Sequence, residues 1–399
     1  MPSRTATNAA PFIPLHSPCL DDRAWEYIQQ CLASNWVSSA GPFVSRFEQM
    51  VAEYLKVRYA VATVNGTAAL HIALLVAGVQ PDDEVLVSSL TFIASANAIR
   101  YVGAWPVFID ADPQYWQMDP EAVFHFLERE CQWRNGALYN RHTQRRVKAI
   151  LPVHILGHPV NLEPILQLAR KYDLLVLEDA AEGLGAYYKG RAVGSLADAA
   201  CLSFNGNKII TCGGGGMFVT NRADWAERAR YLTTQARDDP IEYIHRDIGY
   251  NYRLTSLQAA LGCAQMEKLE EFVQRKRQLA RSYAERLADL PSISLPAEAP
   301  WARSTYWLYT ILVRDRNHNL GSRELLHWLR QHGIECRPLW QPLHRSPVYA
   351  QLPRRLCPVA DRLYQQAISL PSSVGLTEQQ QEWIIRTIKS YFIGSNAAA

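Results

Sequence analysis

The sequence predicts an α/β fold: a large mixed, mostly parallel sheet with helices on both faces, followed by a smaller C-terminal α+β domain. Between residues 59 and 221, short β-rich runs alternate with amphipathic stretches, which is the pattern of parallel strands joined by crossover helices. Pro291, Pro296 and Pro300 then mark a boundary between two units. We therefore expect three parts: an N-terminal segment (1–30) that packs on the small domain, a large domain (31–288) and a small domain (289–399).

Short apolar or β-branched runs predict the strands of the large domain. These strands are expected at 59–64, 84–88, 105–109, 148–153, 174–178, 199–204 and 217–220. Apolar residues at helical spacing predict helices at 68–77, 92–101, 162–172, 224–234 and from 256 to about 287. In the small domain we expect strands at 306–313 and 335–337, and helices at 323–331 and 378–391, the last capped by Thr377.

Composition and charge exclude several classes of protein. The 399 residues are 48% hydrophobic and 20% charged, which is typical of a globular chain rather than a disordered or fibrous one. With 41 basic and 38 acidic residues the net charge is +3, so the chain has no electrostatic footprint for nucleic acid or an acidic membrane surface. No run approaches the roughly 18 apolar residues of a membrane span.

Cysteine and histidine usage indicates a reducing compartment and no metal site. The eight cysteines are scattered, and the N-terminal residues lack the apolar core of a secretory signal, so we expect a cytoplasmic location. The 11 histidines are dispersed, with no H-E-x-x-H motif and no Cys/His cluster that would hold a metal ion.

The first chemical signal is Lys208, one of only eight lysines. It lies between Asn207 and two isoleucines, shortly before four consecutive glycines at 213–216. A lysine in an apolar setting has a lowered pKa and can act as a nucleophilic amine that forms a Schiff base. Taken alone, a glycine loop with an incidental lysine explains the segment equally well. The order is not that of a phosphate-binding Walker loop, in which the lysine follows the glycines.

The second signal is Asp179, at the end of the buried run 174–178. Open α/β sheets bind their ligands at the carboxyl ends of the strands. A carboxylate there either caps the following turn or pairs with a protonated ring nitrogen, as the coenzyme pyridoxal phosphate (PLP) requires.

The third signal is the turn Asn65-Gly66-Thr67-Ala68, where a strand passes into a helix. Free N–H groups at a helix N-terminus and the Thr67 hydroxyl make an anion site, although a plain helix cap is the favoured reading of this turn alone. The order of the three signals adds to their weight. An early phosphate cup, a carboxylate at a middle strand and a lysine 29 positions later match the arrangement of a fold-type I PLP enzyme. The G-x-G-x-x-G fingerprint of a nucleotide-dependent dehydrogenase or epimerase is absent.

The sequence resembles the DegT/DnrJ/StrS-type nucleotide-sugar aminotransferases, which are fold-type I PLP enzymes. The motifs are the Asn65 turn, EDAAE around Asp179, SFNGNKIITCGGGGM around Lys208 and GYNYRLT at 249–255. The variant SFNGNKIIT with its glycine-only run, together with NWVSSAG at 35–41, resembles the LegC-like branch. That branch transfers an amino group from glutamate to C4 of UDP-linked 4-keto-6-deoxy-N-acetylhexosamines for bacterial surface glycans. Related sugar dehydratases have histidine in place of this lysine, which favours transamination.

The resemblance implies a role for each matching residue. Lys208 and Asp179 would be catalytic, with Lys208 forming the Schiff base with PLP and Asp179 pairing with its ring nitrogen. Glu182 would lie beside the coenzyme ring and Phe92 would stack on it. Thr67, Ala68 and Ser203 would hold the phosphate, and Asn251, with Arg253 nearby, would reach the site from a second subunit. The resemblance therefore implies a homodimer with shared active sites.

Polar and aromatic residues suited to a sugar and a diphosphate are candidates for substrate contacts. They are Trp36, His154, His158, Arg253, Tyr306, Arg337 and His344. Two alternatives stay open: an aminotransferase for a dTDP- or GDP-linked keto-sugar, and a non-catalytic regulatory or binding protein with the same fold.

The stretch 131–146 (CQWRNGALYNRHTQRR) is polar and rich in arginine. We interpret it as a solvated insertion between a helix and a strand, in preference to a phosphate-binding element.

Overall fold

Seven strands form the central sheet in the order β1-β11-β10-β7-β6-β2-β3. They are β1 (Tyr59–Thr63), β2 (Glu84–Ser88), β3 (Trp105–Ile109), β6 (Val147–Leu151), β7 (Leu175–Asp179), β10 (Ala199–Ser203) and β11 (Gly216–Thr220). The run from β10 to β3 is parallel, while β11 is antiparallel to both of its neighbours. The predicted mixed, mostly parallel sheet is confirmed, and each of its strands lies where the sequence predicts one. The computed structural model describes residues 12–239, 241–314, 321–353 and 355–397.

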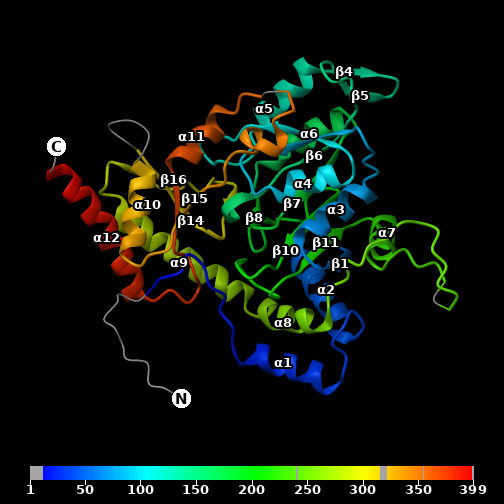
Figure 1. Cartoon of the computed structure of the whole chain (residues 1–399), viewed down its shortest axis with the longest axis horizontal. Helices are drawn as coiled ribbons and strands as arrows, with labels where there is room; N and C mark the ends of the chain where they lie inside the picture. The colour runs from blue at the N-terminus through cyan, green and yellow to red at the C-terminus, as the bar shows by residue number, and fades with distance from the viewer. Residues whose placement is uncertain (1–11, 240, 315–320, 354, 398–399) are drawn as a thin grey trace.

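Helices cover both faces of this sheet (Figure 1). One face carries α3 (Gly66–Val76), α4 (Ala94–Tyr101) and α7 (Ala223–Thr233). The other carries α1 (Asp22–Ala33), α2 (Pro42–Leu55), α5 (Pro120–His125), α6 (Leu162–Lys171) and α8 (Ser256–Met266). The period-2 alternation of a strand divides the core, since Val61 packs with the first set of helices and Ala60 and Ala62 with the second.

The predicted helix from 256 to 287 is two helices, α8 and α9 (Leu269–Leu287). Helix α8 begins with a capping box in which Thr255 and Gln258 bond reciprocally. Helix α8 ends at Met266 and α9 begins at Leu269, and the residue before α9, Lys268, has φ and ψ of −105° and −3°. No glycine or proline marks this break, so the sequence pattern runs through it.

The arginine-rich stretch 131–146 folds into a two-stranded hairpin of β4 (Cys131–Arg134) and β5 (Ala137–Asn140). It projects from the large domain beside α5 (Figure 1). Asn135 and Gly136 form its turn with positive φ values of 49° and 76°. Asn-Gly is the strongest short-range hairpin signal, so the hairpin was readable from this dipeptide. The predicted solvated insertion between a helix and a strand thus has the form of an ordered hairpin.

The small domain is built on an antiparallel sheet of order β12-β14-β16-β15. Its strands are β12 (Ile293–Ser294), β14 (Tyr309–Val313), β15 (Arg337–Pro338) and β16 (Ala367–Leu370). Its helices are α10 (Gly321–Gln331), α11 (Pro358–Gln366) and α12 (Glu378–Ala397). The C-terminal half of α9 also contributes Tyr283 and Leu287 to this core. Short elements complete the chain: β8 (Tyr187–Tyr188), β9 (Arg191–Ala192), β13 (Ala302–Arg303), the π-helix Phe126–Glu130, and 3-10 turns at Ile155–Gly157, Leu343–Arg345 and Pro347–Tyr349.

The N-terminal segment touches both domains. Ile13 pairs with Ile334, and the Ser372 N–H donates to the Leu15 carbonyl, so this stretch lies on the small domain. Helix α1 then packs on α8 of the large domain (Figure 1). Residues 1–11 of the predicted segment lie outside the described residues. Within the described ranges, no helix combines the length and the apolar character that a bilayer crossing requires.

Candidate active site

A cavity of about 380 Å³ opens at the carboxyl ends of β7 and β10 and at the N-terminus of α3. Its lining comes from the turn before α3, the segment leading into α4, the ends of two central strands and two tryptophans near the small domain. The lining residues are Asn65, Gly66, Thr67, Leu70, Thr91, Phe92, Ala94, Ser95, Val153, Asp179, Ala181, Glu182, Ser203, Asn205, Asn207, Lys208, Trp307 and Trp340. The structure therefore brings together six residues predicted from sequence: Thr67, Phe92, Asp179, Glu182, Ser203 and Lys208.

The Lys208 amine lies between an acid and an aromatic ring. Its Nζ is 3.5 Å from Glu182 Oε1 and 4.3 Å from the ring centroid of Trp307. Burial raises the pKa of Glu182, and the positive charge of Lys208 opposes that rise. The Leu156 N–H donates a 2.7 Å hydrogen bond to the other oxygen of Glu182, which fixes this carboxylate beside the amine.

Asp179 presents a buried carboxylate to the same cavity. It is the last residue of β7, and it accepts hydrogen bonds from Ser95 Oγ at 2.6 Å and from the Ala181 N–H at 3.1 Å. Burial raises the pKa of this carboxyl, while the bond from Ser95 acts against the rise. A cationic N–H group brought to Asp179 would stabilise its ionised form, because an opposite charge offsets the cost of burial.

The turn before α3 forms a compact cup. Asn65 caps the helix by accepting a 2.8 Å hydrogen bond from the Ala68 N–H through its side chain. Gly66 lies so close to Ser203 that a Cβ at position 66 would be 2.9 Å from the Ser203 Cβ. Thr67 and Ser203 thus both line the cavity at the positive end of a helix of 11 residues, an arrangement that suits an anion. Ala68 is buried and lies behind this lining, with its N–H used by the cap.

The glycine run at 213–216 packs its backbone against the turn at Asn65. Gly215 pairs with Asn65 and has a φ of +138°, and Gly213 has a φ of +74°. A Cβ at Gly216 would lie 2.3 Å from the Asn65 carbonyl oxygen. The run thus supplies both a backbone conformation and a close approach that side chains would prevent.

The other predicted site residues lie outside this cavity. His154 is fully buried, with Nε2 3.0 Å from Glu178 and Nδ1 accepting from the Val160 N–H, so neither nitrogen is open to a ligand. His344 bonds to Ser89 Oγ at 2.7 Å. His158 is buried and bonds to the Pro159 carbonyl, and burial lowers its pKa to about 4.

Five further candidates are distributed over the surface or the domain boundary. Trp36 is exposed, and Arg337 is exposed and pairs with Glu335 at 2.8 Å. Tyr306 is half-buried, lies next to Arg277 and does not line the cavity around Lys208. Asn251 is exposed, and Arg253 donates to the Ser39 carbonyl from the face near α2.

Sequence reasoning missed Ser95, Trp307 and Trp340. Ser95 carried no local signal, because its partner Asp179 is 84 positions away. Trp307 adjoins the predicted Tyr306, and it is the indole of Trp307 that lies under the Lys208 amine, while Tyr306 has a positive φ of 50° and does not line the cavity. Trp307 also donates a 2.6 Å hydrogen bond from Nε1 to the Asn207 carbonyl.

His16 is a second residue that the sequence did not mark. Both of its ring nitrogens are buried and have no hydrogen-bond partner among the residues that the structure describes. Burial lowers its pKa, and the nearby amines of Lys276 and Lys208 lower it further. It is therefore a neutral imidazole close to the cavity.

Comparison with known proteins relates this geometry to a family. Residues 18–389 match the model of the DegT/DnrJ/EryC1/StrS aminotransferase family. The chain is 38% identical over 381 residues to the GDP-perosamine synthase of Escherichia coli O157:H7, covering 96% of this chain and 99% of that protein. It is 37% identical to the putative pyridoxal phosphate-dependent aminotransferase EpsN of Bacillus subtilis, with 95% of each chain covered.

Solved structures show the same fold. The crystal structure of DesV from S. venezuelae, in complex with a ketimine intermediate, has a TM-score of 0.84 and 31% identity, covering 96% of this chain and 98% of that one. A DegT/DnrJ/EryC1/StrS aminotransferase from Brucella abortus has a TM-score of 0.83 and 29% identity, covering 93% of this chain and 95% of that one.

Proposed function

This chain belongs to the DegT/DnrJ/EryC1/StrS aminotransferase family, whose members use PLP, and we propose that it aminates C4 of a UDP-linked 4-keto-6-deoxy-N-acetylhexosamine with L-glutamate as the donor. The product would be a UDP-4-amino-4,6-dideoxy sugar for bacterial surface glycan synthesis. The observation that carries the proposal is the Lys208 amine in a cavity with Glu182 3.5 Å away and Asp179 at the end of the neighbouring strand.

The residues present suit PLP. Thr67 and Ser203 would hold the phosphate at the N-terminus of α3, and Asp179 would pair with the ring nitrogen. Phe92 lines the same cavity and is 56% exposed, so its side chain is available to a bound ring. Bound there, PLP supplies the electron sink that stabilises negative charge on the reacting carbon.

The chain itself supplies the proton transfer and the electrostatics. With the coenzyme bound, the Lys208 amine would be the group that holds it and the base that takes up and returns a proton at the substrate carbon. A positioned base of this kind contributes about 10²–10⁴-fold to the rate. Glu182 lies beside the amine and would orient it, and Asp179, bonded to Ser95, would keep the coenzyme's ring nitrogen protonated.

Two nucleotides, UDP and GDP, are candidates for the nucleotide part of the keto-sugar substrate. The LegC-like motifs around Lys208 and at 35–41 support UDP. The GDP-perosamine synthases at 38% identity favour a GDP-linked keto-sugar as the second candidate. The two substrates differ in the base and in the N-acetyl group, so parallel assays separate them.

Visible absorption spectroscopy of the purified protein tests coenzyme, donor and acceptor together. With PLP, we expect a visible band from the lysine-bound coenzyme that bleaches on addition of glutamate. Its return with the UDP-linked keto-sugar, and not with the GDP-linked one, would support the proposal. Return only with the GDP-linked sugar would establish the second candidate. A folded protein that gives no band with excess PLP would contradict the aminotransferase assignment.

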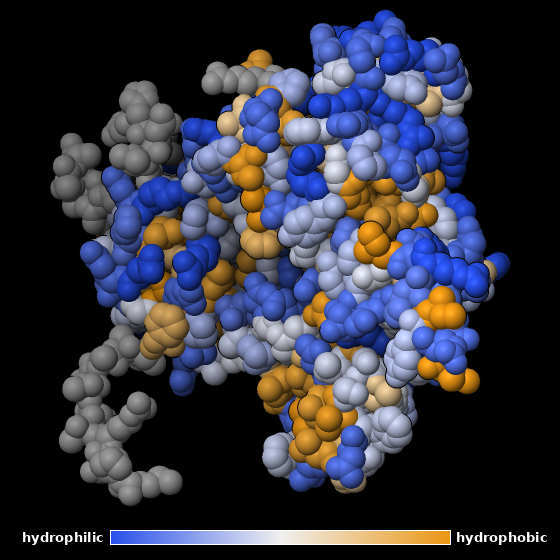
Figure 2. All heavy atoms as spheres, turned by 45° about the vertical axis from the view of Figure 1, so that its right-hand side comes forward, coloured by the Kyte–Doolittle hydropathy of each residue, from blue (hydrophilic) through white to orange (hydrophobic). Residues whose placement is uncertain are grey.

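The proposal includes a homodimer with shared active sites. Helix α1 and the loop after it expose Trp25 (62%), Leu32 and Trp36, and the segment 241–248 exposes Ile241 and Ile248. Figure 2 shows apolar surface gathered at the lower end of the molecule, where α1 lies. Apolar patches of this kind mark interfaces, and a second copy would bring Asn251 and Arg253 to the cavity.

Subunit mixing tests this sharing. Lys208→Ala and Asn251→Ala are each expected to be inactive as homodimers. If each site takes Lys208 from one chain and Asn251 from the other, dissociating and re-mixing the two variants should restore about a quarter of the wild-type activity, since half of the dimers are mixed and each carries one intact site. A mixture that stays inactive although exchange is complete would contradict shared sites.

The proposed location is the cytoplasm. All eight cysteines are free thiols in the structure, which supports a reducing compartment.

A further inference from the structure

A second cavity, of about 230 Å³, lies beside the hairpin β4–β5, at the amino ends of β2 and β3. It shares no lining residue with the cavity around Lys208, which opens at the carboxyl ends of the strands. Its lining residues are Glu84, Trp105, Pro106, Val107, Phe108, Glu130, Asn140, His142, Thr143, Arg145, Leu352, Pro353 and Arg355. The hairpin stretch, which the proposed reaction does not use, contributes four of these residues.

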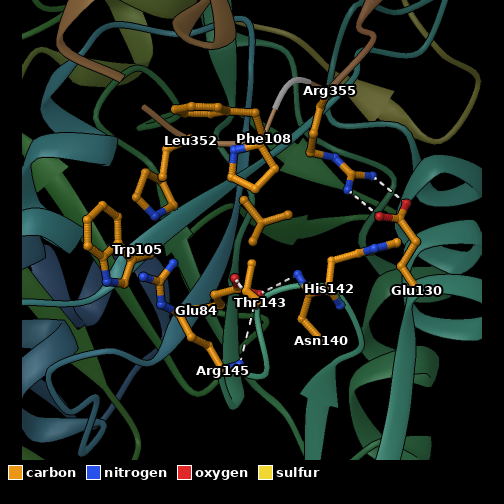
Figure 3. A pocket seen from close by; sticks show the side chains of 13 residues that line it. Glu84, Trp105, Phe108, Glu130, Asn140, His142, Thr143, Arg145, Leu352 and Arg355 are labelled. Atoms are coloured by element: carbon orange, nitrogen blue, oxygen red, sulfur yellow. Dashed lines mark hydrogen bonds and ion pairs between the residues drawn. The ribbon is translucent and has the colours of Figure 1, made fainter. Parts of the chain in front are cut away.

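The cavity has a polar side and an apolar side (Figure 3). Glu84, Asn140 and Thr143 lie along one side, and Phe108 and Leu352 lie across from them. Arg355 and Glu130 close one end with two hydrogen bonds of 2.8 and 2.9 Å. Arg145 and Trp105 lie at the other end (Figure 3).

Glu84 is an incompletely satisfied carboxylate at the base of the polar side. It is 2% exposed, and its two oxygens accept one hydrogen bond each, from Asn140 Nδ2 at 2.8 Å and from Thr143 Oγ1 at 2.7 Å. A carboxylate offers about four acceptor positions, so each oxygen can accept one more. A ligand that brings a pair of neighbouring N–H groups would fill both, and would offset the burial of the charge.

Arg145 supplies a positive charge that lies in a long ion pair with Asp82 and over the ring of Trp105. Its guanidinium lies 4.3 Å from the ring centroid of Trp105, and its nearest acid, Asp82, is 4.0 Å away. The side chain of Arg145 makes no hydrogen bond to the described residues, in contrast to Arg355, whose donors are used by Glu130. His142 is exposed and lines the cavity on the side toward Glu130 (Figure 3). The end at Arg145 therefore suits a phosphate group, which arginine binds with several parallel N–H donors.

We propose that this cavity binds a guanine nucleotide, with Glu84 accepting hydrogen bonds from the base edge and Arg145 holding the phosphate. Guanine carries a ring N–H next to an exocyclic amino group, whereas uracil carries one N–H between two carbonyl oxygens that a carboxylate repels. Phe108 and Leu352 provide an apolar surface that a flat base would cover. An amino acid or a free phosphate would leave this apolar surface without a contact. The volume equals roughly seven or eight waters of about 30 Å³ each, enough for the base, with the phosphate at the open rim.

Calorimetric titration of the PLP-loaded protein with GMP, guanosine, UMP and inorganic phosphate tests the proposal. We expect one GMP per chain, with UMP and phosphate at least about tenfold weaker, as the loss of a charge-assisted contact implies. Arg145→Ala should weaken GMP by about tenfold or more and leave guanosine unchanged. Glu84→Gln should weaken GMP and guanosine alike. Arg134→Ala is the matched control, because it removes the same charge from the hairpin outside the cavity lining.

The outcomes separate this cavity from the substrate site. GMP binding that is unaffected by Arg145→Ala and Glu84→Gln would place the nucleotide elsewhere and overturn the proposal. Equal affinities for GMP and UMP, or for GMP and phosphate, would also overturn it, as would the absence of any GMP binding. Arg145 lies at the cavity rim, so Arg145→Ala is expected to fold. This variant therefore still tests the proposal if Glu84→Gln does not fold. None of these measurements depends on turnover, so a failure here leaves the proposed reaction untouched.

Discussion

The amine of Lys208 lies over the indole of Trp307, 4.3 Å from the ring centroid. The two residues are 99 positions apart and come from opposite sides of the proline-marked boundary between the domains. The indole also donates to the Asn207 carbonyl, next to the lysine. The ring is thus a cation–π partner for the amine. Through its hydrogen bond to Asn207, it also links the loop that carries Lys208 to the segment that enters the small domain.

Substitution of Trp307 separates these two contributions. Trp307→Phe keeps an aromatic face and loses the Nε1 bond, so the free energy of unfolding should fall by about 0.5–1.5 kcal/mol, with activity reduced less than in the next variant. Trp307→Leu removes the face as well, a cation–π term of about 0.5–2 kcal/mol, and should lower kcat further. Denaturant unfolding and steady-state kinetics measure the two effects. Equal activity in the Phe and Leu variants would show that the ring face does not act on the amine.

Replacement of Lys208 by arginine should abolish turnover and preserve the fold. Arginine keeps the positive charge beside Glu182 but cannot act as the base, so multiple-turnover activity should fall by more than about 10²-fold. Circular dichroism and an aminotransfer assay check the two parts, with Lys189→Arg as the surface control. Undiminished turnover in Lys208→Arg would remove this residue from the mechanism.

The bond from Ser95 to Asp179 predicts a graded pair of variants. Ser95→Ala removes a hydrogen bond to a charged group, worth about 1.5–3 kcal/mol, and should weaken PLP retention by about tenfold or more. Asp179→Asn removes the charge itself and should cost more activity than Ser95→Ala. Equilibrium dialysis of PLP and assays at saturating PLP measure the series. The reverse order, with Ser95→Ala the more damaging, would show that Ser95 acts on something other than Asp179.

Gly216 should not tolerate a side chain. A Cβ there would lie 2.3 Å from the Asn65 carbonyl oxygen, and backbone atoms cannot give way as a flexible side chain does. Gly216→Ala should lower the free energy of unfolding by at least about 1–3 kcal/mol and weaken PLP binding, because the cup must move. Gly206→Ala, where a Cβ meets nothing within 4 Å, is the control and should be near neutral. Equal stability of the two variants would contradict the close approach.

Lys276 should make stability depend on pH. Its amine is buried and donates to the Trp307 and Ser372 carbonyls, and burial lowers its pKa to about 7. The unfolded pKa is about 10.4, so between these values the unfolded chain holds one more proton than the folded chain. The contribution of Lys276 is full above about pH 10.4, declines as the pH falls and is lost below about pH 7.

Denaturant unfolding at pH 7.5 and 9 checks this sign. The wild-type free energy of unfolding should gain up to about 1.4 kcal/mol per pH unit from this group, and Lys276→Met should lack that gain. Identical pH slopes in the two proteins would show that the lysine keeps its charge in the folded state.

Local patterns sufficed for the strands and for the order of the chemical groups. Strand ends at Asp179 and Ser203 follow from short apolar runs, and parallel strands bring their carboxyl ends to one edge. The four glycines indicated a backbone requirement, which Gly215 and Gly216 meet beside Asn65. The break between α8 and α9 at Lys268 could not be predicted in this way, because no glycine or proline lies there.

The sequence by itself thus determined the α/β class, the family resemblance and the residues Lys208, Asp179 and Thr67, because periodicity, turn chemistry and motif spacing are properties of neighbouring residues. Only the tertiary structure decided that Ser95 supports Asp179, that Trp307 rather than Tyr306 faces Lys208, and that His154 is enclosed by Glu178 and Val160. It also decided that Glu84 and Arg145 share a cavity. These relationships join segments that are distant along the chain, and the side-chain directions that create them are set by packing between elements, which no local pattern records.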